Sequence, residues 1–300
     1  MTVREAIDSI LARIPGVNLE RTVDTFKGGD PDAALAGVAT TFMATRTVLA
    51  RAVELKANLV ITHEPTYYNH LDETDWLTGD AVYESKRRYI DENRLVVWRF
   101  HDYWHRIKPD GILTGMARRL GWEKYQSPPG SKFLVFPPTT AGELAESARR
   151  ALGARLVRIA GDSATPISRV FFEVGAMGGR EQIADLMRDD VDAVVCGESP
   201  EWETCEYVRD SAAAGRKKAL IVLGHCDSEE AGMEYLAEWL RPLFPGVPVH
   251  FVPAGNPFKN LGRVEHWRDK SRRHQRPLVE PYVRFSRIRL TDTVHSKACA

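Results

Sequence analysis

Cysteine is scarce in this chain, with four in 300 residues and no closely spaced pair. That low density excludes a disulfide framework, and the spacing excludes a zinc site built from cysteine alone. A net charge is also lacking, because Lys plus Arg and Asp plus Glu both number 41. The protein as a whole therefore has no field that would attract nucleic acid or an acidic membrane surface. We expect a reduced, cytoplasmic protein.

Long apolar runs are missing as well. No run approaches the roughly 18 to 20 residues that a membrane-spanning helix needs. The first residues, MTVREAIDSILARI, carry Glu5 and Asp8 and lack the basic start and apolar centre of a signal peptide. What the chain does have is 43% hydrophobic and 27% charged residues, and enough length for two lobes of ordinary size. The composition favours a globular protein without a membrane segment.

Strands and helices alternate along the chain. An amphipathic helix opens it at 3–14, and 37–62 predicts a strand, a helix and a strand, an order that implies parallel pairing. The pattern then repeats until Pro128, Pro129 and Gly130 interrupt it. Further strands and helices follow, and the last predicted strand is VPVHFVP. We therefore expect an α/β fold with largely parallel sheets, a first lobe at 1–127 and a second lobe at 128–257.

A basic C-terminal extension is predicted at 258–300. Residues 259–300 hold eleven Lys or Arg against four Asp or Glu. Such a segment can bind phosphates, and binding of nucleic acid through it would be steeply salt-dependent. Because it also carries Trp267, Tyr282 and Phe285, we favour an extension that packs on a neighbouring subunit or stays solvated over a nucleic-acid partner.

Four apolar runs each end on a residue type that can bind a metal. NLVIT precedes His63 and Glu64, RLVVWRF precedes His101, DAVVCG is followed by Glu198, and KALIVLG precedes His225. In an open α/β sheet the carboxyl ends of the strands face a common crevice where ligands bind. The sequence therefore predicts that these side chains gather at one place.

Taken alone, His63 and His225 favour a structural role over a metal ligand, whereas the segment with His101 and His105 favours neither. His101 and His105 are four residues apart, a spacing that keeps both imidazoles within reach of one ion. Gly224 allows a sharp turn before His225, and Glu229 falls in the first turn of the next helix, which we expect to begin at Asp227 or Ser228. Four of the nine histidines thus follow apolar strands directly, which chance placement would not produce.

The combined pattern predicts a metal centre whose ligands are His63, Glu64, His105, His225 and Glu229. Three imidazoles and two carboxylates exceed what one four-coordinate ion needs, and they suit two divalent ions bridged by a carboxylate. This mixture of nitrogen and oxygen ligands suits Zn, Mn, Fe or Co. Residues that could orient the ligands or take part in catalysis are His101, Asp102, Glu198 and Glu201. Structural alternatives remain for them, since acidic residues also favour helix N-termini.

With these motifs in place, the chain resembles the Nif-three-like family of dinuclear-metal proteins, also known as GTP cyclohydrolase 1 type 2 homologues. The resemblance covers nearly all of 1–257. It rests on the helix, strand and THEP unit at 47–65, on GGREQIADLMRDDVDAVVCGESPEWET at 178–204, and on GHCDSE at 224–229. It implies two similar α/β lobes with the metals in the cleft between them, and a homo-oligomer that is often a ring-shaped hexamer.

Two positions depart from the family pattern that this resemblance implies. Members usually carry two adjacent histidines before the proline, and an Asp four residues after the histidine of the middle motif. Here Glu64 stands where the second histidine is expected, and His105 stands where the Asp is expected. The two exchanges offset each other, so the ligand set keeps its composition and formal charge. We therefore expect a retained metal site.

Two functions compete at this point. The first is a dinuclear metal-dependent hydrolase that acts on a nucleotide or another phosphorylated small molecule, because two ions can activate a water for attack. The second is a non-catalytic metal-binding or interaction protein that oligomerises around a metal-stabilised fold. Removal of the metal separates the two, since only the first predicts that turnover of a substrate is lost.

Overall fold

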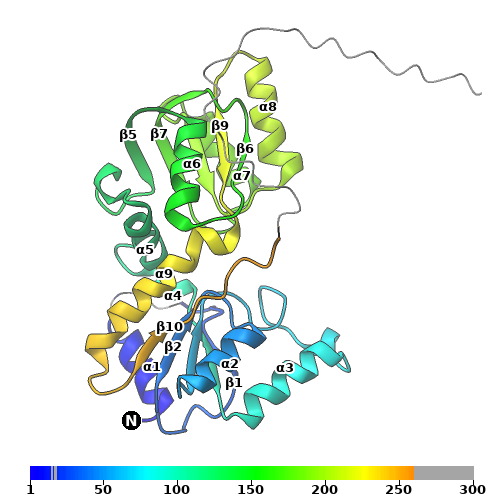
Figure 1. Cartoon of the computed structure of the whole chain (residues 1–300), viewed down its shortest axis with the longest axis vertical. Coiled ribbons are helices and arrows are strands. Elements are labelled where there is room, and N and C mark those ends of the chain that lie inside the picture. The colour runs from blue at the N-terminus through cyan, green and yellow to red at the C-terminus, as the bar shows by residue number, and fades with distance from the viewer. Residues whose placement is uncertain (15, 17–18, 260–300) are drawn as a thin grey trace, which may run out of the picture. The chain divides into compact units, whose positions relative to one another are not determined.

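Two five-stranded sheets carry the fold in the computed structural model, which describes residues 1–14, 16 and 19–259 (Figure 1). The strand orders are β1-β4-β3-β2-β10 and β5-β7-β8-β9-β6. Each sheet has a parallel centre and at least one antiparallel edge strand, so the predicted mixed α/β fold is confirmed. The predicted basic extension at 258–300 lies outside the described residues except for Phe258 and Lys259.

The first sheet has four parallel strands and the antiparallel edge strand β1. Its strands β2, β3 and β4 are buried at every position, because helices cover both faces of the sheet. This double burial explains why they read as continuous apolar runs in the sequence. The bounds are β1 Phe26–Gly28, β2 Val38–Thr41, β3 Leu59–Thr62, β4 Val96–Arg99 and β10 Val249–Phe251.

Alternate residues of these strands face two different cores. Leu59 and Ile61 belong to the large central core, whereas Val60 packs in a second core beneath α2 and α3. A capping box formed by Thr2 and Glu5 fixes the start of α1, whose buried face joins the central core. The helices around this sheet are α1 Val3–Leu11, α2 Arg46–Glu54 and α3 Ala81–Glu92.

The second sheet has the parallel strands β7, β8 and β9 at its centre and antiparallel strands on both edges. Its bounds are β5 Phe133–Thr140, β6 Arg158–Ala160, β7 Pro166–Glu173, β8 Ala193–Cys196 and β9 Ala219–Val222. The helices that accompany it are α6 Ala141–Leu152, α7 Gly179–Met187 and α8 Glu206–Ala213, and a π-helical turn at Glu201–Cys205 precedes α8.

Two helices join the sheets. Helix α5 (Gly111–Leu120) packs along α9 (His225–Leu240), and Gly115 and Gly232 let their backbones approach closely. A Cβ at Gly115 would lie 2.4 Å from the carbonyl oxygen of Ala231. The central core therefore runs without a break from Leu59 of the first sheet to Val170 of the second. No helix in the described part of the chain is long and apolar enough to cross a membrane.

Strand β10 lies in a different sheet from the one we expected. The sequence order assigns it to the second lobe at 128–257, but it pairs in parallel with β2 of the first sheet. The preceding helix α9 contacts β2 and β10 and so carries the chain back to the first sheet. A boundary between lobes near 127 and 128 stays a prediction, because the core and β10 both connect the two sides of it.

Two helical assignments also differ from the sequence-based expectation. Helix α9 begins at His225 after Gly224, not at Asp227 or Ser228. Ser228 does not act as the cap, because its hydroxyl donates to the carbonyl of His225 and accepts from the N–H of Gly175. Helix α5 was not predicted, although Asp110 caps it and Gly121 ends it in a left-handed conformation.

The buried carboxyl group of Glu173 makes stability depend on pH. The side chain of Glu173, at the end of β7, is 3% exposed and interacts with Asp185 of α7. Burial raises the pKa of Glu173 from 4.5 to about 7, against the opposing charge of Lys132. A raised pKa means that the folded state holds this proton more tightly than the unfolded state does. The stabilisation is therefore complete below about pH 4.5 and is lost as the pH rises to about 7.

Replacing Glu173 with glutamine should remove this loss, because an amide stays neutral and can still donate to Asp185. At pH 8 we expect Glu173→Gln to be more stable than the wild type by about 2 kcal/mol, and at pH 4 the difference should be small. Urea unfolding at several pH values measures it. Glu92→Gln, which changes an exposed side chain, serves as the control. An equal gain in the free energy of unfolding at both pH values would contradict the explanation by the raised pKa of Glu173.

Candidate metal centre

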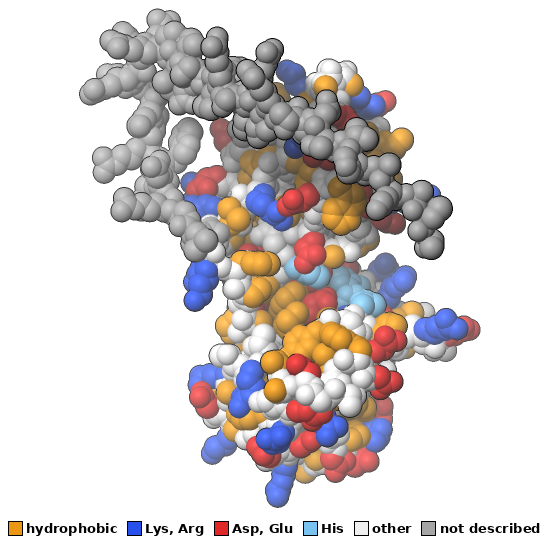
Figure 2. All heavy atoms as spheres, turned by 90° about the vertical axis from the view of Figure 1, so that its right-hand side faces the viewer, with side chains coloured by type: hydrophobic (Ala, Val, Ile, Leu, Met, Phe, Trp, Pro, Cys, Tyr) orange, Lys and Arg blue, Asp and Glu red, His pale blue; other side chains and the backbone are white. Residues whose placement is uncertain are grey.

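Six imidazole and carboxylate side chains follow the carboxyl ends of three strands. His63 and Glu64 follow β3, and His101 follows β4. The short helix α4 (Asp102–Arg106) carries His105, and α9 after β9 carries His225 and Glu229. Figure 2 shows histidine side chains gathered on one face beside acidic and apolar side chains. Strand β9 belongs to the second sheet, so residues as far apart in the sequence as 63 and 229 meet where strand ends of the two sheets come together.

Two carboxylates lie among the ring nitrogens. Glu64 Oε1 lies 4.0 Å from His63 Nε2, 3.7 Å from His101 Nε2 and 3.6 Å from His225 Nε2. Glu229 Oε2 lies 3.5 Å from His63 Nε2 and 3.2 Å from His225 Nε2. The ring of His105 lies 5.0 Å from that of His63. Ligands at about 2.1 Å around a tetrahedral ion stand roughly 3.4 Å apart, so these separations suit metal binding.

Two groups in the described residues could each hold a metal ion. One joins His63, His101 and His105, and the other joins His63, Glu64 and Glu229, with ligand atoms within 4.8 Å of one another. His225 adjoins the second group through Glu64 and Glu229. All five predicted ligands therefore lie in one cluster, and His101, which we expected in a supporting role, belongs to the first of these groups.

Each imidazole of the cluster is oriented through Nδ1. The acceptors are the Phe100 carbonyl for His63 at 3.2 Å, Asp102 for His101 at 2.9 Å, Asp110 for His105 at 2.9 Å and Glu198 for His225 at 2.9 Å. A carbonyl oxygen only accepts hydrogen bonds, so His63 Nδ1 carries a proton and its neutral ring presents a lone pair at Nε2. Histidines that ligate metals are usually oriented in this way.

Two polar atoms at the centre of the cluster are left without a partner. His63 Nε2 and Glu229 Oε2 are buried and have no hydrogen-bond partner within the described part of the chain. Buried polar atoms without a partner are costly and rare in native proteins. A metal ion would satisfy both atoms at once, so the residues present fit such a group.

The ionisable groups of the cluster influence one another strongly. Burial lowers the pKa of His63 well below its usual value, and the charges of His101 and His105 add to this effect. Burial also acts to lower the pKa of His225, but the nearby carboxylates of Glu229 and Glu64 outweigh it and raise the value to about 11. The same pairing lowers the pKa of Glu64 in spite of its burial. Strongly shifted pKa values of this kind are typical of functional sites.

Arg99 contacts His63 and Glu64 of the cluster, and this role was not predicted from the sequence. It is fully buried at the end of β4, and its Nε donates to the His63 carbonyl at 3.0 Å. One terminal nitrogen lies 3.7 Å from Glu64 Oε2, and the other donates to the His70 carbonyl and lies 3.8 Å from Asp72. The guanidinium therefore holds the segment that presents His63 and Glu64.

Three further residues that shape the site were missed. Asp24 accepts from the backbone N–H groups of His101, Asp102 and Tyr103 and so fixes the start of α4. Asp110 both orients His105 and caps α5, a role that its place before an amphipathic stretch could have indicated. Gly175 approaches so closely that a Cβ there would lie 2.2 Å from Glu229 Oε1. No local pattern marks Asp24 or Gly175.

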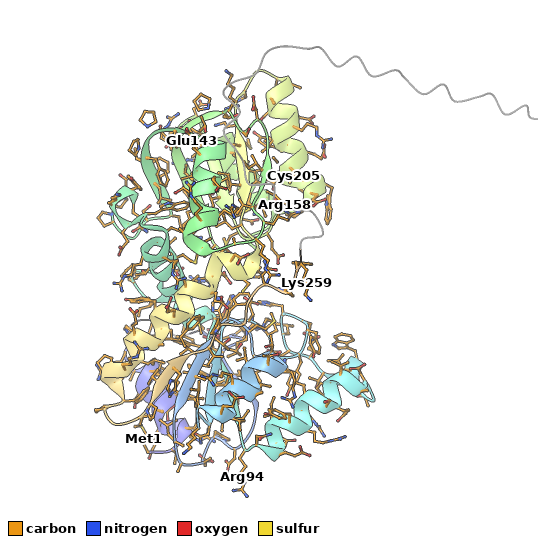
Figure 3. All side chains as sticks on the ribbon, viewed as in Figure 1. Met1, Arg94, Glu143, Arg158, Cys205 and Lys259 are labelled. Carbon is orange, nitrogen blue, oxygen red and sulfur yellow. The ribbon has the colours of Figure 1, made fainter. Side chains whose placement is uncertain are left out.

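The predicted supporting residues separate into two sets. Asp102 and Glu198 contact cluster histidines, and the hydrogen bond from His101 keeps the pKa of Asp102 well below its usual range. Glu201 is not brought to the cluster. It pairs with Arg158 at 2.8 Å, and both line a separate cavity with Cys205. Figure 3 shows Arg158 and Cys205 close together beside the second sheet. Glu201 begins the π-helical turn, so its side chain faces β6.

A cavity of about 940 Å³ opens beside the cluster. Glu64, Glu198 and His225 line it on the side of the cluster, and the rest of its wall comes from the start of α2, the segment after β3 and the first turns of α3. Ligand sites are commonly concave, with apolar walls and a few polar groups. This cavity is large enough to hold a small molecule in contact with the cluster.

Comparisons with known proteins agree with this fold. The family model Duf34/NIF3 (NGG1p interacting factor 3) matches residues 1–257. A Clostridium perfringens protein named GTP cyclohydrolase 1 type 2 homolog is 23% identical over 235 residues, which cover 74% of this chain and 85% of that protein. Staphylococcus aureus protein SA1388 has a similar fold, with a TM-score of 0.67, 16% identity, and coverage of 87% of this chain and 99% of that one. A Bacillus cereus protein related to NIF3 gives a TM-score of 0.67 at 14% identity, with 87% and 99% covered. The chain belongs to the Duf34/NIF3 family.

Proposed function

We propose that this protein is a dinuclear metal-dependent hydrolase that acts on a nucleotide or another phosphorylated small molecule. The observation that carries the proposal is the arrangement of four imidazoles, each held at Nδ1 by an oxygen, around two buried carboxylates. The name of the Clostridium perfringens relative supports GTP as the first substrate to test.

Six side chains would hold two divalent ions: His63, Glu64, His101, His105, His225 and Glu229. Glu64 would hold an ion together with the histidines, because its Oε1 lies within 4.0 Å of three ring nitrogens. Zn, Mn, Fe and Co all accept such a mixture of nitrogen and oxygen ligands. When bound, a pair of divalent ions lowers the pKa of a water and polarises the bond to be cleaved.

The chain's own residues orient the ligands and move protons. Asp102, Asp110 and the Phe100 carbonyl each fix one ring, so that Nε2 faces the centre of the cluster. Glu198 lines the cavity and uses Oε1 to hold His225 Nδ1. Its second oxygen would accept a proton from the attacking water and return it to the leaving group.

Chelation of the metal provides the test. We expect the purified protein to contain about two divalent ions per chain and to hydrolyse GTP or a related nucleotide, with turnover reduced at least about 100-fold after chelation and restored by added metal. Circular dichroism would check that the fold persists. If chelation lowers only the melting temperature, and no nucleotide is turned over by the loaded protein, the non-catalytic metal-binding function replaces the hydrolase. The oligomer, including the hexamer, stays a prediction.

A further inference from the structure

We propose that Lys86, Thr66 and Arg46 form a subsite that binds the phosphate group of the ligand in the cavity beside the metal cluster. The inference deepens the proposed function and rests on it for the identity of the substrate. All three residues line the 940 Å³ cavity together with Glu64 and His225 of the cluster.

Lys86 is a buried cation without a carboxylate partner. Its side chain lies on the second turn of α3, and the residue is only 6% exposed. The ammonium group donates to the Thr66 carbonyl at 2.5 Å, and no carboxylate of the described residues lies within 4.0 Å of it. The nearby Asp72 is already paired with Lys27 at 3.1 Å. Its other contacts are the rings of Tyr67 and Tyr68, whose centroids lie 5.8 and 5.3 Å from Nζ, so two of its three N–H donors have no oxygen acceptor among the described residues.

Burial of the Lys86 amine disfavours its charged form. Removal from water lowers the pKa of Lys86 to about 8, and the charge of Asp72 opposes the shift only in part. A buried charge normally has a partner of opposite sign, because desolvation is otherwise not compensated. A bound phosphate would provide that partner and add charge-assisted hydrogen bonds.

The hydroxyl of Thr66 is a second, independent indication of a ligand. Thr66 is fully buried, and its Oγ1 has no hydrogen-bond partner among residues 1–14, 16 and 19–259. A hydroxyl can donate to a phosphate oxygen, so a ligand at this position would satisfy it. Lys86 contacts the carbonyl of the same residue, which places both donors on one part of the cavity wall.

Arg46 supplies a second cation that is not neutralised. It is the first residue of α2, and its guanidinium lies over the ring of Tyr89 without an ion pair to any described carboxylate. The remaining wall includes Met43, Pro65, Tyr68 and Val82, which can pack against an apolar or aromatic part of a ligand. The acids Glu64 and Glu198 face cluster histidines. The ligand is therefore expected to turn its phosphate towards Lys86.

Inorganic phosphate is the probe, and its binding to the whole chain is measured by titration calorimetry, before and after chelation of the metal. Lys86→Met should weaken phosphate binding about tenfold or more, as for a charge-assisted hydrogen bond, and Thr66→Val about threefold to tenfold, as for a typical hydrogen bond. Arg46→Gln changes an exposed side chain, so it remains informative if a buried variant does not fold.

Lys218→Met is the matched control. Lys218 is also a buried lysine that donates to backbone carbonyls, those of Arg188 and Val191, but it does not line this cavity. Its substitution should leave phosphate affinity unchanged, with melting temperature read separately for every variant. Binding that survives chelation and depends on Lys86 supports the subsite.

Three results would overturn the subsite. They are an absence of phosphate binding, binding that disappears on chelation, and binding that folded Lys86→Met and Arg46→Gln retain in full. None of these readouts uses turnover or metal content. A failure of the subsite is therefore distinct from a failure of the hydrolase, which the metal and nucleotide assays decide.

Discussion

Replacing His63 with alanine is expected to lower the metal content from about two ions per chain to one or none, and to reduce turnover at least about 100-fold. His63 Nε2 is common to both candidate groups of ligand atoms, so its loss removes a ligand from whichever ion it would bind. Its ring is fully buried, and its Nε2 has no other partner in the described residues. Elemental analysis of the purified variant measures the first effect, and a nucleotide assay measures the second.

His250→Ala is the matched control for this substitution. His250 lies on β10, within the first sheet but outside both ligand groups. The metal content of the His250→Ala variant should equal that of the wild type. If His63→Ala kept its full metal content in a folded protein, the proposed ligand set would be wrong. If only one ion were lost and turnover persisted, a single-ion site would replace the dinuclear one.

A second large effect is expected for Arg99→Met. Arg99 is fully buried and lies within 4.0 Å of Glu64 and Asp72, so its removal leaves two buried carboxylates with less compensation. It also removes the hydrogen bond to the His63 carbonyl. Removing one partner of a buried ion pair typically costs about 3–5 kcal/mol of the free energy of unfolding. Urea unfolding of the two proteins measures the difference.

Arg51→Met is the control variant for Arg99→Met. Arg51 pairs with Glu54 on the exposed face of α2, with both side chains more than half exposed. Exposed pairs of this kind contribute about 0–1 kcal/mol. A loss of less than 1 kcal/mol in Arg99→Met would show that Arg99 does not hold the His63 segment as proposed. We also expect lower metal content in Arg99→Met, because Glu64 loses its support.

Much of the cluster could be predicted because it follows a local rule. Buried parallel strands are apolar throughout, so their ends are visible in the sequence, and the residues after neighbouring strands such as β3 and β4 meet at one edge of a sheet. This is why His63, Glu64, His101 and His225 could be identified without a structure. That the end of β9 in the second sheet meets those of β3 and β4 was decided by the tertiary structure. The four-residue spacing of His225 and Glu229 on one helix brought a fifth side chain to the same place.

The supports of the cluster could not be predicted in the same way. Asp24 holds α4 from 77 or more residues away in the sequence, and Arg99 reads as part of an apolar strand. Glu201 is acidic and follows a strand end, as Glu198 does. It is the first residue of the π-helical turn, and its side chain pairs with Arg158. Local patterns do not encode such differences in direction.

The sequence by itself determined the alternation of strands and helices, the α/β class and the residue types at the strand ends, because these depend on hydrophobic period and on short-range backbone preferences. Only the tertiary structure decided that β10 returns to the first sheet, that α5 and α9 join the two sheets through Gly115 and Gly232, and that each ring nitrogen has its acceptor. These features depend on packing between segments far apart in the chain. Their free energy arises from burial and hydrogen bonds that form only when those segments meet.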